Sequence, residues 1–169
     1  FNAAPDGDGN FNEIDLSIPI DNAQSSKLKA YLQGFKKKTL DFDDDIKAGI
    51  LASRTLMQHS NGNNLRGPKD VIDEGTDFKD ICSESAKVFT ALMQSIEYHA
   101  RVVWMCKHTV AEVYHPKTGW VLVDSHSGRV FKNKRNQYMS LLGIRENHKD
   151  VSVVRVNKKN NWDNQNIHK

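Results

Sequence analysis

Two absences in the sequence exclude whole classes of protein. The 169 residues include only two cysteines, Cys82 and Cys106, which is too few for a disulfide framework or a four-thiolate zinc site. Either both thiols are free or they form a single disulfide bridge. No stretch approaches the roughly 18 consecutive apolar residues of a membrane-spanning helix, and no internal repeat is present. We therefore expect one globular domain of ordinary size without an integral membrane segment.

A signal-peptide pattern is also lacking, and the first residue is Phe1 rather than methionine. This start indicates a processed or trimmed end, from which a targeting segment could have been removed. A processed start favours a secreted or extracytoplasmic location, although the compartment is left open. Residues 1–24 begin with a Gly-, Asn- and Asp-rich stretch, and we expect them to form a partly disordered N-terminal extension. Residues 161–169 are expected to form a C-terminal tail.

Positive charge is concentrated at the C-terminal end of the chain. The net charge of +3 combines +7 over residues 129–169 with −4 over residues 1–128. A basic segment can attract phosphates or anionic surfaces. Stacking aromatic residues, however, are not interleaved with these charges as they are in proteins that bind single-stranded nucleic acid. We therefore expect a solvated basic end and no nucleic-acid partner.

Periodic apolar residues predict three helices in the first hundred residues. The first begins at Ser25 or Ser26, either of which can cap it. The second covers about residues 43–59, and the third covers about residues 83–97. A loop at residues 60–80, rich in Gly, Asn and Asp, separates the second helix from the third. Long loops inside compact domains are often functional.

Two groups of residues raise the question of a metal site. The acidic run Asp41–Asp45 lacks the alternating ligands, the central glycine and the distal glutamate of a calcium loop. Acidic residues favour the positive N-terminal end of a helix, so we interpret the run as a helix start. A second group fits no zinc signature in its spacing; its members are Cys106, His108, His115 and His126. We predict that the protein needs no metal and no other cofactor.

Strand patterns replace the helical period after residue 99. Three runs are β-branched and aromatic: ARVVWM at 100–105, HTVAEVY at 108–114 and GWVLVD at 119–124. The segment HPKTG joins the second run to the third as a hairpin. A short helix is expected at residues 135–142 and a last strand at residues 151–156. Helices first and an antiparallel sheet afterwards indicate an α+β fold.

Three residues in this part of the chain can form a catalytic group. Cys82 stands where the third helix begins, and unpaired amides and the helix dipole stabilise a thiolate there. His108 opens a strand and can take the thiol proton, provided that a third group holds its ring. Asp124 ends the neighbouring strand, and in a hairpin that end lies near the start of the other strand. Asp124 either holds the imidazole in this way or reaches water.

The same residues resemble the transglutaminase-like superfamily of papain-type thiol enzymes, in particular its bacterial-type domains. The matching positions, in chain order, are Cys82 with Ala86 and Phe89, Ala100–Val103, His108 with Glu112, Val113 and Tyr114, Gly119–Trp120, and Asp124. The resemblance implies N-terminal helices packed on an antiparallel sheet, with the catalytic domain at residues 25–160. It also implies Cys82 as nucleophile, His108 as proton carrier and Asp124 as the group that orients the imidazole.

Three positions depart from the pattern of that superfamily. Asp80-Ile81 stands where a glycine usually precedes the cysteine. Val110 replaces the aromatic residue that commonly lies two positions after the histidine, and Ser125 replaces the proline that commonly follows the aspartate. None of these changes removes a catalytic group. They indicate a divergent branch with a different substrate groove.

The oxyanion hole is only half defined by the resemblance. The backbone amide of Cys82 is implied as one donor to the oxyanion. The pattern does not identify the second donor, and Gln58, Asn63 and Asn64 are candidates because they lie just upstream.

Four other residues admit more than one interpretation. Cys106 can tune the site, pair with the catalytic thiol, or act as a small buried hydrophobic residue, which we favour. Glu112 either orients a neighbouring group or lies exposed on its strand. Trp104 and Trp120 are expected to be core or rim aromatics rather than a platform for substrate.

The predicted function is that of a thiol enzyme acting on amide bonds of a protein or peptide through an acyl intermediate on Cys82. Water as the acceptor makes it a peptidase or amidase, and an amine makes it a protein-glutamine gamma-glutamyltransferase. We favour hydrolysis because the sequence lacks the accessory domains and calcium-binding segments of the animal cross-linking enzymes. The alternatives are a binding module that keeps the fold without the chemistry and an adaptor that acts through the basic end. The oligomeric state is left open.

Overall fold

The computed structural model describes residues 14–15, 22–35, 41–57, 82–105, 108–157 and 162–165. Several features predicted from the sequence lie outside these ranges: the loop at residues 60–80, the oxyanion candidates Gln58, Asn63 and Asn64, and Cys106. Asp80-Ile81 and the side chain of Trp104 also lie outside them.

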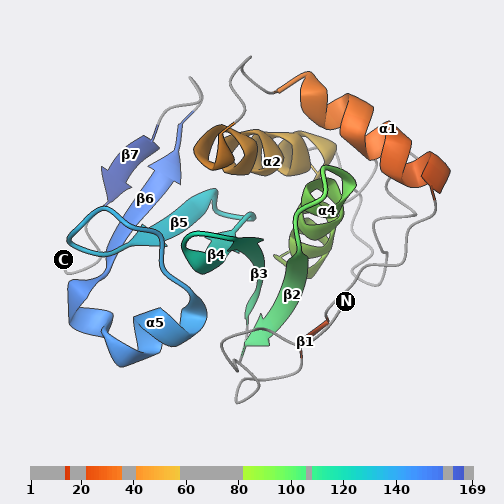
Figure 1. Cartoon of the computed structure of the whole chain (residues 1–169). Coiled ribbons are helices and arrows are strands. Elements are labelled where there is room, and N and C mark those ends of the chain that lie inside the picture. Colours follow the sequence, from red (N-terminus) through yellow and green to blue (C-terminus); the bar gives the residue numbers. More distant parts are fainter. Residues whose placement is uncertain are drawn as a thin grey trace.

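The described residues form a seven-stranded antiparallel sheet with helices on both faces (Figure 1). The helices are α1 (Asn22–Gln33), α2 (Phe42–Met57), α4 (Cys82–Ser95), α5 (Leu141–Glu146) and the 3₁₀ helix η2 (His148–Asp150). The strands are β1 (Ile14–Asp15), β2 (Ala100–Met105), β3 (His108–His115), β4 (Gly119–Asp124), β5 (Arg129–Lys132), β6 (Ser152–Val156) and β7 (Trp162–Gln165). They lie side by side in chain order. The predicted α+β fold is confirmed.

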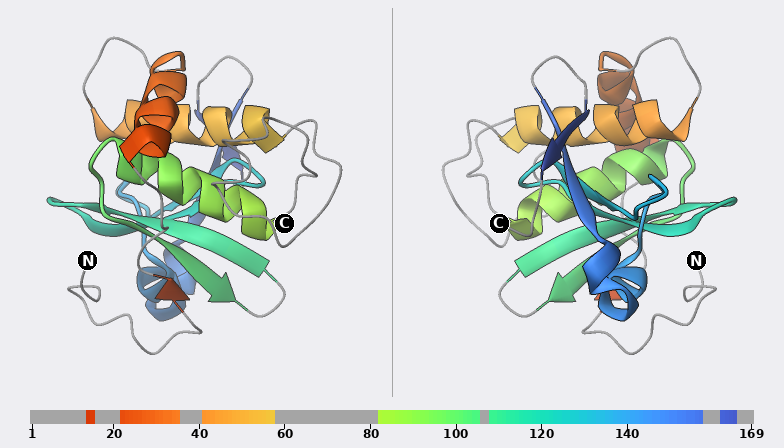
Figure 2. Two further views of the ribbon diagram at one scale, coloured as in Figure 1. Left: turned by 90° about the vertical axis from the view of Figure 1, so that its right-hand side faces the viewer. Right: turned by 90° about the vertical axis from the view of Figure 1, so that its left-hand side faces the viewer.

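The main core lies between the sheet and the pair of helices α2 and α4 (Figure 2). Ile46 and Ile50 from α2 and Phe89 from α4 are fully buried there against the odd-numbered residues of β3 and β4, such as Ala111 and Val123. Residues of one strand alternate between the two faces of a sheet. The even-numbered residues therefore face the other side, where α5 covers them.

Helix α1 packs on the outer side of α2 and α4 through Leu28 and Leu32. Its apolar stripe agrees with the sequence, but the predicted start is wrong: Ser25 and Ser26 lie inside the helix, which begins at Asn22. An apolar stripe fixes which side of a helix packs, whereas the first turn depends on local contacts. No helix in the described part of the chain combines the length and apolarity needed to cross a bilayer.

The acidic run does begin a helix, as predicted. Asp41 precedes α2, and its Oδ1 accepts a hydrogen bond of 2.7 Å from the backbone N–H of Asp44. Such a bond satisfies one of the amide donors that a helix leaves unpaired at its start. Further along, Glu97 has a φ of 72°, a left-handed conformation that helices do not continue through. Helix α4 therefore ends at Ser95, two residues before the predicted end.

The C-terminal part of the chain departs most from the sequence prediction. The helix expected at residues 135–142 instead begins after Ser140, whose Oγ accepts a hydrogen bond from the N–H of Gly143. Residues 162–165, within the expected tail, form β7 along β6. Strands β1 and β5 were not predicted either. All three of these strands have two to four residues, too short for an alternating pattern to stand out.

Asp43 in the first turn of α2 holds β7 and the segment before α5 in place. The Tyr138 hydroxyl and the Trp162 Nε1–H, the latter at 2.7 Å, both donate to Asp43 Oδ1. The Nζ of Lys47 lies 3.2 Å from the other carboxylate oxygen. Burial works to raise the pKa of Asp43, but these three partners together hold the pKa below its ordinary value. The sequence predicted only that Asp43 helps to start a helix. In the structure it also binds residues from two distant segments of the chain.

The lowered pKa of Asp43 predicts a contribution to acid sensitivity. A carboxyl with a lower pKa in the folded state stabilises the fold above its ordinary pKa of 3.8, and this stabilisation is lost as the pH falls through the folded value. Asp43→Asn should cost about 1 kcal/mol at pH 7, since the charged acceptor is partly exposed. It should also flatten the loss of stability below pH 4. Urea unfolding at several pH values measures both effects.

Asp41→Asn is the matched control for that experiment, because asparagine caps a helix as well as aspartate does. Its unfolding free energy at pH 7 should stay close to that of the wild type. An Asp43→Asn variant with the same pH dependence as the wild type would contradict the assigned role.

Candidate active site

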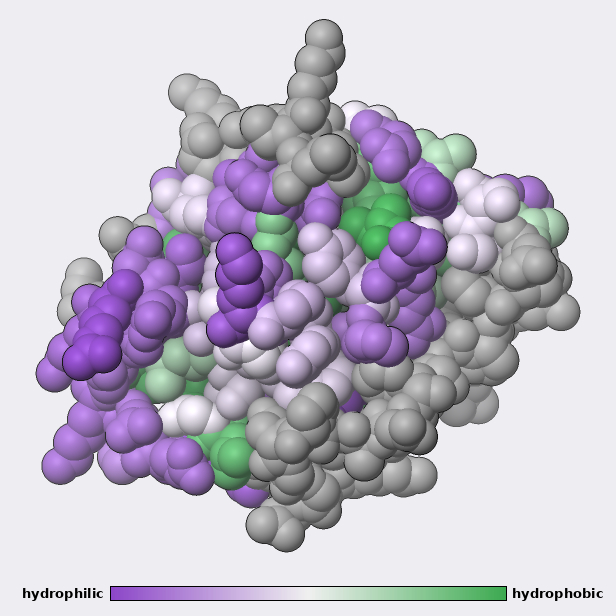
Figure 3. Space-filling view, viewed as in Figure 1, coloured by the Kyte–Doolittle hydropathy of each residue, from purple (hydrophilic) through white to green (hydrophobic). Residues whose placement is uncertain are grey.

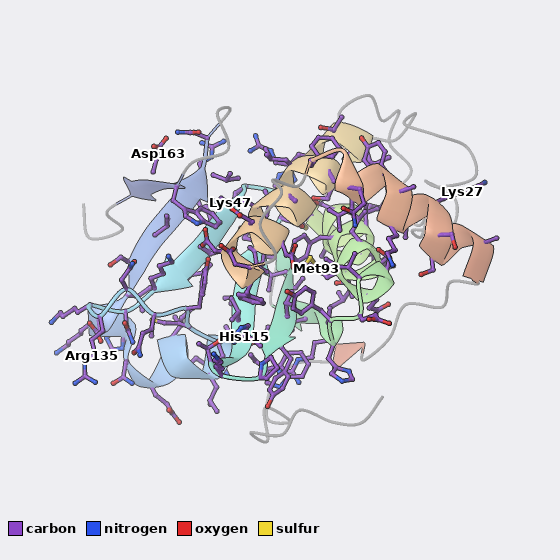
Figure 4. The ribbon with its side chains drawn as sticks, turned by 45° about the horizontal axis from the view of Figure 1, so that its top comes forward. Lys27, Lys47, Met93, His115, Arg135 and Asp163 are labelled. Carbon is purple, nitrogen blue, oxygen red and sulfur yellow. The ribbon has the colours of Figure 1, made fainter. Side chains whose placement is uncertain are left out.

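Cys82 is the first residue of α4 and is partly exposed. It heads a stripe formed by the residues three, four, seven and eleven positions later, which share its face of the helix. The other members of the stripe are Ser85, Ala86, Phe89 and Met93, all fully buried. Met93 lies in the interior between the helices and the sheet (Figure 4). The stripe therefore directs Cys82 towards the sheet side of α4, at the end where the helix dipole favours a thiolate.

Helix α4 and strand β3 run in the same direction, because β2, which lies between them in the chain, runs in the opposite direction. Figure 2 shows α4 beginning at the end of the sheet where β3 begins. Because β4 pairs with β3 in antiparallel register, the same end of the sheet holds the end of β4. The topology thus collects the first residues of α4 and β3 and the last residue of β4 in one region.

His108 and Asp124 are hydrogen-bonded in this region, with 2.9 Å between His108 Nε2 and Asp124 Oδ2. The register pairs Ala111 with Val123, so His108 and Asp124 are diagonal neighbours on one face, within reach of long side chains. The Asp124 side chain is 13% exposed and that of His108 is 33% exposed. With Nε2 engaged by the carboxylate, Nδ1 is the ring nitrogen left to exchange a proton with a thiol.

Cys82 and His108 belong to different layers of the fold. His108 shares its sheet face with Val110, which packs in the cluster under α5, whereas α4 covers the opposite face. Contact between Cys82 and the His108 ring must therefore be made around the end of the sheet, where β3 begins. The structure brings His108 and Asp124 together, and the contact with Cys82 stays a prediction.

A buried serine pair ties the start of α4 to the residue after Asp124. The Oγ atoms of Ser85 and Ser125 lie 3.0 Å apart, and the two residues are 0% and 1% exposed. Ser85 lies one helical turn after Cys82, which corresponds to about 5 Å along the axis. The first turn of α4 is thus fixed against the end of β4, next to the carboxylate.

Glu112 is not an exposed strand residue, so that interpretation is wrong. Its side chain is fully buried and its Oε1 lies 2.6 Å from an Arg101 guanidinium nitrogen. Its other oxygen accepts a hydrogen bond of 3.0 Å from the Leu141 backbone N–H, at the start of α5. The Arg101 guanidinium also lies 3.9 Å from the centre of the Trp120 ring, and Trp120 is buried, consistent with a core aromatic.

Arg101 was missed by the sequence interpretation although a signal for it exists. It is a charged residue inside the apolar run 100–105. Once runs 100–105 and 108–114 are paired as a hairpin, it falls directly opposite Glu112. A buried charge needs such a partner, so the register alone could have identified the pair.

The described residues contain one group of three acidic, histidine or cysteine side chains close enough to share a cation: Asp41, Asp43 and Asp44, with oxygens within 4.8 Å of one another. Lys47 already lies 3.2 Å and 3.4 Å from two of these carboxylates. The lysine ammonium thus acts as the counter-ion of the group.

His115 lies at the far end of β3 from His108, next to the hairpin turn. Its ring packs on Phe42 with 4.5 Å between ring centres, and its Nδ1 accepts a hydrogen bond from the N–H of Lys117. Burial and the Lys117 charge both lower the pKa of His115. The residue therefore belongs to the packing of the hairpin on α2.

Several basic residues of the described C-terminal elements are directed to solvent, whereas Lys132 is buried. Hydrophilic residues gather over the C-terminal elements (Figure 3), and Lys134, Arg135 and Lys149 are exposed. A pocket between the turn at Lys134 and helix η2 is lined by side chains of both signs, and Asp150 there accepts a hydrogen bond from the Lys134 N–H. The pocket contains none of the three candidate catalytic residues.

A comparison with known protein families finds a match. A family model described as the transglutaminase-like superfamily matches residues 33–125, which is more than half of the chain. The matched span begins at the end of α1 and ends directly after Asp124, so it includes all three candidate catalytic residues. No curated protein and no solved structure matches the chain.

Proposed function

The chain belongs to the transglutaminase-like superfamily, and we propose that it is a thiol enzyme that acts on amide bonds through an acyl intermediate on Cys82. The observation that carries the proposal is the hydrogen bond between His108 and Asp124. That bond lies at the end of the sheet where α4 begins with Cys82. The catalytic domain is proposed to cover residues 25–160, and the substrate is proposed to be a protein or peptide.

Each of the three residues has one role in the proposed reaction. The Cys82 sulfur attacks the carbonyl carbon while its proton passes to the free nitrogen of His108. The protonated imidazole then donates that proton to the leaving amine, and a thioester remains on Cys82. Asp124 holds the ring in the required tautomer and stabilises its positive charge. The backbone N–H of Cys82, at the start of the helix, stabilises the oxyanion.

The second half of the reaction decides the class of enzyme. An acceptor attacks the thioester, His108 takes a proton from it, and the thiol is released. Water as the acceptor gives hydrolysis, and an amine gives transfer. We propose hydrolysis because the His108 side chain is one-third exposed, which leaves the ring accessible to water. Amine transfer is the alternative, and so is a binding module without activity.

Mass spectrometry of the protein after incubation with glutamine-containing peptides tests the proposal. Trypsin releases Cys82 in the peptide Asp80–Lys87 and Cys106 in the peptide Val102–Lys107, so an adduct is assigned to one thiol directly. We expect an acid-quenched sample to carry the acyl group on Asp80–Lys87. Hydrolysis of the intermediate should release the acyl group as a free carboxylic acid. If an added amine is the acceptor, the acyl group should accumulate as an amide of that amine instead.

Cys82→Ala provides the control, since it should show neither the adduct nor the product. Product formed by this variant at the wild-type rate would disprove the proposal. The absence of any adduct, together with ordinary thiol reactivity of Cys82, would favour the binding module.

A further inference from the structure

The hydrogen bond between Ser85 and Ser125 is placed where it can control the alignment of the proposed catalytic group. It joins two elements that are 40 residues apart in the chain. One of them carries the thiol a single turn away, and the other carries the carboxylate one residue away.

The two serine hydroxyls lie in the protein interior, where an apolar group of similar size would need no hydrogen-bond partner. A buried hydroxyl without a partner is unfavourable, because it loses its hydrogen bonds to water. Both Ser85 and Ser125 are fully buried, and each hydroxyl is a hydrogen-bond partner of the other. Ser125 also stands where proline commonly follows the aspartate in the superfamily that the chain resembles. The interaction is therefore a feature of this sequence, and a proline at residue 125 could not make it.

We propose that Ser125, acting through Ser85, is a positioning residue that sets the distance between the Cys82 sulfur and the imidazole held by Asp124. This inference rests on the proposed function. A helix moves as a rigid element, so fixing its first turn against residue 125 fixes the start of the helix relative to residue 124. A displacement of about 1 Å between reacting groups can lower a rate ~100-fold.

The pH dependence of Cys82 alkylation by iodoacetamide tests the proposal. An imidazole in contact with the thiol keeps it reactive well below the ordinary thiol pKa of about 8.5. The Ser125→Ala variant and the double variant Ser85→Ala/Ser125→Ala should shift this profile towards higher pH. At pH 6 both should be alkylated roughly 10-fold more slowly than the wild type. Ser125→Thr keeps the hydroxyl and should restore most of the rate.

The double variant separates positioning from stability. A single replacement leaves one buried hydroxyl unpaired and should lower the midpoint of thermal unfolding, whereas removing both hydroxyls should recover part of that loss. Ser95→Ala is the matched control, because Ser95 is a buried serine at the other end of α4 whose Oγ donates to the Leu92 carbonyl. This variant should leave the alkylation profile unchanged.

Two results would overturn the inference while the proposed function stands. In the first, the double variant recovers both the stability and the alkylation profile of the wild type, which would mean that the single variants act through stability alone. The other is a wild-type profile in every serine variant. A wild-type protein whose Cys82 is alkylated only near pH 8.5 gives a different outcome: the proposed function fails, and the inference fails with it.

Discussion

Replacement of Cys82 by alanine is expected to lower turnover by a factor on the order of 10⁴ or more, because no other group can form the thioester. Labelling by iodoacetamide at mildly acidic pH should disappear from the tryptic peptide Asp80–Lys87 at the same time. Cys82 is partly exposed, so the free energy of unfolding should change by less than about 1 kcal/mol. Activity and urea unfolding of the same preparation separate loss of chemistry from loss of fold.

Cys106→Ala is the matched comparison for this prediction, since it removes the other thiol of the chain. It should retain turnover and labelling of Cys82. Full activity of Cys82→Ala, or equal loss of activity in the two variants, would contradict the assignment of the nucleophile. Cys82 is a free cysteine in the structure, not half of a disulfide bridge, so it should be alkylated without prior reduction in the wild type and in Cys106→Ala alike.

Glu112→Gln is expected to destabilise the fold by about 3–5 kcal/mol, which is the largest effect on stability that we predict. The substitution removes the Glu112 charge beside the Arg101 guanidinium, which stays charged and is only 1% exposed. It also weakens the acceptor of the Leu141 N–H, through which α5 is attached to β3. The unfolding free energy measured in urea gives the effect directly. A loss of less than about 1 kcal/mol would contradict the role assigned to the pair.

Two further variants test whether this effect comes from the loss of the Glu112 charge beside Arg101. Glu146→Gln makes the same chemical change on the exposed surface of α5 and should cost less than about 0.5 kcal/mol. The double variant Arg101→Met/Glu112→Leu removes both charges and fills similar volume. It should be more stable than Glu112→Gln, because apolar replacement of a buried ion pair is often neutral.

The order of the catalytic candidates and the elements that hold them could be predicted from the sequence. Cys82 at a helix start, His108 at the first residue of a strand and Asp124 at the end of the next strand are local statements. They follow from the apolar period and from the hairpin turn between residues 115 and 119. The antiparallel hairpin then requires His108 and Asp124 to lie at the same end of the sheet, and the hydrogen bond of 2.9 Å joins them there.

Short elements and buried polar contacts could not be predicted in this way. Strand β7 has four residues, and its position depends on the bond from Trp162 to Asp43, 119 positions earlier in the chain. The start of α1 was misplaced because Ser25 and Ser26 are plausible caps that the folded chain does not use as caps. For β7 the deciding interaction joins distant segments, and local propensity carries no information about it.

The sequence by itself predicted the α+β fold class from the spacing of neighbouring residues and the superfamily by resemblance, and both predictions are confirmed. It also supplied the three candidate residues for thiol chemistry, which stay a prediction. Only the tertiary structure decided that Glu112 also accepts a hydrogen bond from the start of α5 and that Ser85 meets Ser125 beside the proposed site. The physical reason is that a polar side chain is buried only where a partner satisfies it. That partner is supplied by the three-dimensional arrangement of helices and strands, which no single stretch of sequence contains.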